Sequence, residues 1–70
     1  MRVVVKLRDA GMAEAIAAEE LFRGFSAATI GGEAYLSATM DRHTAEEVAA
    51  RAREHPGVAA AWSAPEPEAP

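Results

Sequence analysis

The stretch from residue 43 to residue 62 constrains the fold most, because it predicts a helix whose two ends are both marked in the sequence. Thr44 and Glu47 have the spacing of a capping box, in which the threonine hydroxyl accepts the Glu47 amide and the carboxylate reaches back to the Thr44 amide. At the other end Pro56 cannot continue the helix, and Gly57 favours the turn that leaves it. The stripe expected to face inward is Ala45, Val48, Ala49 and Ala52.

Apolar side chains alternate with other residues near both ends of the chain, which is the period of a half-buried strand. The side chains expected to face the core are Val3, Val5 and Leu7 in the first strand and Val58, Ala60 and Trp62 in the last. After the first strand, Asp9 is a suitable N-cap for a helix from about Ala10 to Arg23, and Gly24 is a suitable end.

The apolar residues of this first helix form two groups. One side of the predicted helix contains Ala15, Ala18, Leu21 and Phe22. Met12 and Ile16 lie on a different side of the helix, and Glu19 lies between the two groups. The two groups fit either one wide buried stripe or a second apolar patch that meets a partner.

The middle of the chain predicts a β-hairpin, and the order of elements then predicts the fold class. Strands from Phe25 to Ile30 and from Ala34 to Met40 flank Gly31-Gly32-Glu33, where paired glycines allow a tight turn. The order βαββαβ predicts an α+β, ferredoxin-like two-layer sandwich, with a four-stranded antiparallel sheet and two helices on one face. We expect one domain over residues 1–63 and a flexible Pro/Glu tail over 64–70. The open face of the sheet should carry Arg2, Val4, Lys6, Arg8, Tyr35, Ser37 and Thr39.

Composition narrows the classes of function. The net charge of −4 disfavours nucleic-acid binding, and no run of eighteen apolar residues could span a membrane. The chain has no cysteine, so thiolate metal sites are excluded and the compartment is left open. Asp41 and His43 are too few for a specific metal site, and His55 suits the C-terminal end of the helix. No catalytic triad is recognisable, so we expect no enzyme activity and no cofactor.

Several motifs resemble those of subtilisin propeptides and the related proteinase B inhibitors. The resemblance lies in Thr44-Ala45-Glu46-Glu47-Val48, in Arg53-Glu54-His55-Pro56-Gly57-Val58-Ala59-Ala60, in Val3-Val4-Val5-Lys6-Leu7 and in Gly24-Phe25-Ser26-Ala27. The family has the same fold, and it acts as inhibitor or intramolecular chaperone of a subtilisin-type serine protease. The resemblance implies that the sheet docks on the protease and that the C-terminal segment lies in the substrate cleft. The residues implied for that segment are Trp62, Ser63, Ala64, Pro65 and Glu66.

An alternative hypothesis is a regulatory or assembly module that homodimerises or binds a partner protein. Its surface would include Met12, Ile16 and Tyr35. A third hypothesis, a small-ligand enzyme using Arg8, Asp41 and His43, ranks last because nothing in the sequence brings those groups together.

Overall fold

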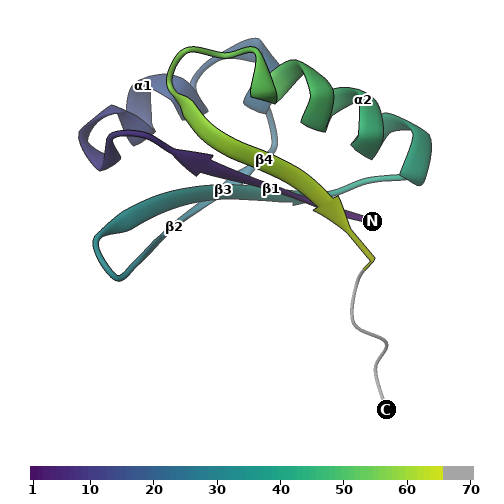
Figure 1. Ribbon diagram of the computed structural model, residues 1–70, viewed down its shortest axis with the longest axis horizontal. Coiled ribbons are helices and arrows are strands. Elements are labelled where there is room, and N and C mark those ends of the chain that lie inside the picture. The colour runs from purple at the N-terminus through teal and green to yellow at the C-terminus, as the bar shows by residue number, and fades with distance from the viewer. Residues whose placement is uncertain (66–70) are drawn as a thin grey trace.

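The computed structural model describes residues 1–65 and shows a four-stranded antiparallel sheet with a helical layer on one face (Figure 1). This confirms the α+β, ferredoxin-like class. The elements in chain order are β1 (Arg2–Leu7), the 3-10 turn η1 (Ala10–Met12), α1 (Ala13–Ala17), the 3-10 turn η2 (Glu20–Phe22), β2 (Ser26–Ile30), β3 (Glu33–Thr39), α2 (Arg42–Arg53) and β4 (Val58–Ala64). Ala64 therefore belongs to the last strand, although we expected the tail to begin there.

The strands lie in the order β2-β3-β1-β4, so β1 and β3 are central, as the crossover argument predicted. The core lies between the sheet and the helices. Its buried residues are Val3, Val5, Leu7, Ile16, Phe22, Ala34, Leu36, Ala45, Ala49, Ala52, Val58 and Ala61. Three of these are the alanines on the inner side of α2, whose small side chains let the helix backbone lie close to the sheet.

The turn between β2 and β3 is the one the glycine pair predicted. Gly31 and Gly32 both have positive φ, at 59° and 82°, and Ile30 lies opposite Glu33. Two positive φ angles in a two-residue loop are the signature of a type I′ hairpin, whose twist matches that of the strands.

The first helix is not continuous, which corrects the prediction of one helix over residues 10–23. Asp9 does cap its start, because its Oδ1 accepts the Gly11 amide at 2.9 Å, but the segment then divides into η1, α1 and η2. Ile16 and Phe22 explain the break. Six residues apart on an α-helix they would point about 120° from each other. The extended conformation of Glu19 reorients the second turn, so both side chains reach the core at 3% and 1% exposure.

The start of α2 also differs from the prediction, because Asp41 is the N-cap and the Thr44–Glu47 capping box does not form. Asp41 Oδ1 accepts the Thr44 amide at 2.9 Å, and Oδ2 accepts the Thr44 hydroxyl at 2.7 Å. The helix therefore begins at Arg42. Glu47 instead pairs with Arg51 at 3.2 Å on the outer side of the helix, as expected.

The last strand faces the core with different residues from those predicted. The register between β1 and β4 shifts between Lys6 and Leu7, where the pairing is irregular. After this shift Val58 and Ala61 are buried, whereas Trp62 lies opposite Val4 on the face away from the helices and is 40% exposed. Because side chains alternate between the two faces of a sheet, this one irregularity moves the side chains that follow it to the opposite face from the one predicted.

Candidate functional site

The open face of the sheet, the side that no helix covers, is the candidate functional surface. Its side chains follow from the pairing registers, because residues opposite each other in a sheet share a face. One row across the strands contains Trp62, Val4, Ser37 and Ser26, and the next contains Ala60, Lys6, Tyr35 and Ala28. Beyond these rows lie Arg2, Thr39 and Ala64 on one side and Glu33 and Ile30 on the other. The sequence predicted most of this face but placed Trp62 inside.

Trp62 dominates one end of this face. Its directly opposite neighbour on β1 is Val4, and the next residue across the sheet is Ser37. Its same-face neighbours along β4 are Ala60 and Ala64, so the indole ring, at 40% exposure, is bordered on its own strand by small side chains. Tryptophan is enriched among the residues that contribute most to binding at protein interfaces.

A polar network lies on the same face, on the side of the β2–β3 turn. Lys6 Nζ lies 3.1 Å from Glu33 Oε1, and the Tyr35 hydroxyl donates to Glu33 Oε2 at 2.9 Å. The hydrogen bond from Lys6, followed by that from Tyr35, lowers the pKa of the Glu33 carboxyl from its usual value. The same carboxylate raises the pKa of Lys6 and the pKa of Tyr35. The three groups satisfy one another, so the network presents no unpaired charge to a partner.

The residues implied by the protease-inhibitor resemblance lie mostly within β4. Trp62, Ser63 and Ala64 pair with Val4, Val3 and Arg2 along β1. Pro65 follows the strand and is exposed, and Glu66 lies outside the described residues. The segment therefore leaves the sheet directly beside the open face, three residues after Trp62.

The structure brings together only two of the three residues expected for an assembly surface, because Met12 and Ile16 line one cavity in the helical layer while Tyr35 lies on the other side of the sheet. Ile16 is buried in the core at 3% exposure and cannot form part of an exposed patch. Met12 is 49% exposed in the helical layer, while Tyr35 lies on the opposite side of the sheet.

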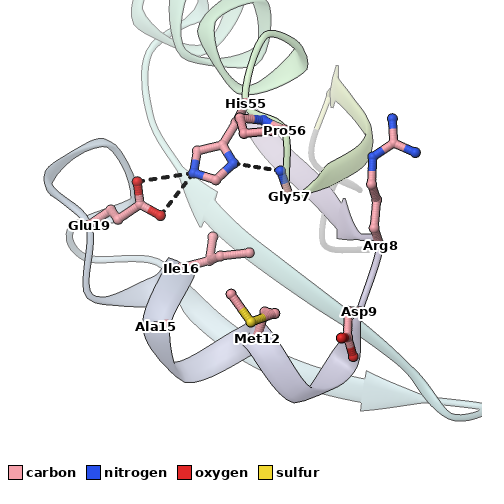
Figure 2. A pocket seen from close by; sticks show the side chains of 9 residues that line it. All are labelled: Arg8, Asp9, Met12, Ala15, Ile16, Glu19, His55, Pro56 and Gly57. Atoms are coloured by element: carbon pink, nitrogen blue, oxygen red, sulfur yellow. Dashed lines mark hydrogen bonds and ion pairs between the residues drawn. The ribbon is translucent and has the colours of Figure 1, made fainter.

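A cavity of about 420 Å³ lies between α1 and the turn from α2 to β4, and sequence reasoning missed it (Figure 2). It is lined by Arg8, Asp9, Met12, Ala15, Ile16, Glu19, His55, Pro56 and Gly57. Arg8 was expected on the open face but borders this cavity instead. No local pattern in the sequence indicates the cavity, because its two sides come from segments that are far apart in the chain and meet only on folding.

His55 lines one side of this cavity and connects two segments of the chain through its ring nitrogens. Its Nδ1 accepts the Gly57 amide at 2.9 Å, so the ring proton lies on Nε2, which donates to Glu19 Oε2 at 2.8 Å. The ring also packs against Phe22, with centroids 5.8 Å apart.

The residues considered for metal binding or catalysis do not converge. Arg8 follows the C-terminal end of β1, whereas Asp41 and His43 lie beyond its N-terminal end, where the Met40 amide donates to Met1. Among residues 1–65 no group of three or more His, Cys, Asp or Glu side chains could hold a metal ion. The helices within the same range are too short or too polar to cross a membrane.

Comparisons with protein-family models, with curated proteins and with solved structures give no match.

Proposed function

We propose that this protein is a non-enzymatic binding protein that docks on its partner through the open face of the sheet. The partner we propose is a subtilisin-type serine protease, which the protein inhibits or helps to fold. One observation carries the proposal: Trp62 is exposed on the open face, in the strand that leads directly into the C-terminal segment.

The character of the open face supports docking on another protein. The same-face neighbours of Trp62 on β4, Ala60 and Ala64, and its opposite neighbour Val4 are small, so a partner surface can approach closely and cover the indole ring. Truncation of a well-covered interface tryptophan typically costs about 2 kcal/mol or more of binding free energy.

The Lys6–Glu33 pair supports the same role. A charged group that is buried without a partner opposes binding strongly, whereas a pair that is already matched does not need the other protein to satisfy it. Lys6 and Glu33 are matched within this chain at 3.1 Å. Docking over them leaves no uncompensated charge.

The C-terminal segment supports the choice of a protease as the partner. Ser63 and Ala64 continue β4, and Pro65 stops the strand from continuing because it lacks the amide donor. A proline-containing segment that follows a docked strand can lie extended in a substrate cleft and resist cleavage. This is the arrangement that the resemblance to propeptide inhibitors implies.

The proposal is tested by titrating the protein into a subtilisin-type protease and measuring residual activity. We expect slow, tight inhibition by the full chain. Trp62→Ser should weaken inhibition about tenfold or more, whereas Met12→Ser, which alters an exposed apolar residue in the helical layer, should not. A version ending at Pro65 keeps β4 intact but removes Glu66 from the implied cleft segment, so it should inhibit more weakly. Digestion of all four proteins without inhibition would show that the proposed function is wrong.

A second candidate function is an assembly module that associates with itself. The observation in its favour is separate from the open face: within residues 1–65 no second strand pairs with the outer edge of β2, and all five residues of that strand are exposed.

A further inference from the structure

We infer that the outer edge of β2 is a self-pairing site, where two copies of this chain join antiparallel and their sheets become continuous. The inference rests on the proposed assembly function, for which it names the surface, the partner and the register. It does not depend on a protease partner.

The first observation is that β2 is uncovered on both faces as well as at its edge. Its five residues are all exposed, including Ala27 and Thr29, whose side chains point to the helical side of the sheet. The helical layer leaves both of them exposed. Figure 1 shows the β2–β3 hairpin extending away from the helices.

The second observation is that the two edges of the sheet are protected unequally. Natural proteins block free strand edges with bulges, prolines or charged side chains. The β4 edge has two such features, because its register against β1 is irregular and Arg53 Nε donates to the Ala61 carbonyl at 2.9 Å. The sequence of β2 is Ser-Ala-Ala-Thr-Ile, with no charge and no proline, and its pairing with β3 is regular.

The turn geometry identifies which backbone groups are free. In a two-residue hairpin the residues that flank the turn form a hydrogen-bonded pair, here Ile30 and Glu33. Hydrogen-bonded and non-hydrogen-bonded pairs then alternate along the strand. The amide and carbonyl groups of Ala27 and Thr29 therefore point outward, away from β3.

The chemistry of this edge fits a second copy of the same chain. A two-fold axis through Ala28 places Ala27 opposite Thr29 of the other copy, so the outward groups meet each other and all five residues overlap. The strand is uncharged, so no like charges meet across the axis even though the chain carries a net charge of −4. Ala28 has too small a side chain to hinder the approach.

The register makes a covalent test possible. Ala28 would face its own counterpart in a non-hydrogen-bonded pair, where Cα atoms lie about 4.5 Å apart, a distance that a disulfide can span. The chain has no cysteine, so Ala28→Cys introduces a single thiol. Ala60→Cys is the matched control, because Ala60 is an exposed alanine of the open face on the opposite edge strand.

The experiment combines this cross-link with solution mass, measured over a range of protein concentrations. We expect the mass to rise with concentration towards twice the 7.4 kDa chain mass, and Ala28→Cys to form a covalent dimer on mild oxidation while Ala60→Cys does not. Thr29→Lys, which places a charge at the exposed edge, should remain monomeric with an unchanged circular dichroism spectrum.

Two results would overturn the inference, and they differ in what they imply for the assembly function. A monomer at every concentration, with no cross-link at residue 28, removes both the β2 edge and the self-association function. A dimer that persists in Thr29→Lys and cross-links no better at residue 28 than at residue 60 removes only the edge.

Discussion

His55 Nε2 lies 2.8 Å from Glu19 Oε2, and this contact joins two segments that are 36 residues apart in the chain. It ties the broken first helical segment to the turn between α2 and β4. Only 18% of the His55 side chain is exposed, and its other ring nitrogen accepts the Gly57 amide. One imidazole thus fixes the geometry of the turn and holds the helical layer against it.

Replacing His55 should destabilise the fold. His55→Ala removes both hydrogen bonds and the contact with Phe22, and we expect a loss of about 1–3 kcal/mol in the free energy of unfolding. His43→Ala is the matched control, because His43 is exposed in the first turn of α2. Urea denaturation of the two variants measures the difference. Equal midpoints would mean that the His55–Glu19 contact does not stabilise the fold.

A side chain at Gly57 should require the end of the Ile16 side chain to move. An added Cβ would lie 2.7 Å from Ile16 Cδ1, which is too close for any real contact. Because Cδ1 is the end of a flexible side chain that borders the cavity, Ile16 can move aside, and Gly57→Ala should cost about 1 kcal/mol. Ile16→Val deletes the colliding methyl group at a cost of about 0.5–1.5 kcal/mol.

The double variant provides the decisive comparison. In thermal or urea unfolding, the Gly57→Ala and Ile16→Val double variant should lose less free energy of unfolding than the two single variants lose in sum. Strict additivity would show that the two residues do not collide.

Asp41, rather than a capping box, should control the start of α2. Asp41→Ala removes the acceptor of the Thr44 amide and hydroxyl, so it should reduce helix content and stability more than Glu47→Ala, which removes only an exposed ion pair. Far-ultraviolet circular dichroism and urea unfolding measure both effects. A larger loss for Glu47→Ala would favour the capping box predicted from the sequence.

The pH dependence of the Asp41 contribution follows from the same contacts. The hydrogen bonds from Thr44 lower the pKa of the Asp41 carboxyl. Its stabilising effect should therefore be fully present above the usual aspartate pKa and should be lost as the pH falls through the lowered value. In Asp41→Ala this part of the acid dependence should be absent.

The pKa of Tyr35 should depend on its hydrogen bond to Glu33 on the open face. The Glu33 carboxylate accepts the Tyr35 hydroxyl, and loss of that hydrogen bond on ionisation raises the pKa of the phenol. Tyr35 is the only tyrosine in the chain, so an ultraviolet pH titration follows it directly. Glu33→Gln should bring the midpoint down towards the ordinary tyrosine value. Glu20→Gln, in the helical layer, should leave it unchanged.

The sequence predicted those elements whose signals are local. Val3, Val5 and Leu7 identify β1 by their spacing, and the turn at Gly31 and Gly32 depends on backbone conformations that glycine adopts readily. The order of the strands then followed from the handedness of the crossovers.

The errors in the prediction arose where contacts distant in sequence override local preference. The first helix breaks because both Ile16 and Phe22 are needed in the core, and Trp62 faces outward because of an irregular pairing on β1. The cavity was missed because Glu19 and His55 meet only in the folded chain. Of the candidate site, the open face was foreseen from the alternation in β1 and β3, but its exposed tryptophan was not.

The most direct test of docking through the open face uses Trp62, which is the only tryptophan in the chain. Labelled as 5-fluorotryptophan, it gives a single fluorine resonance. We expect this resonance to shift when a subtilisin-type protease with a blocked catalytic serine is added to saturation, because the partner covers the indole ring. If the protease binds and the resonance does not move, the open face is not the docking surface. If no binding is detected, the proposed partner is wrong.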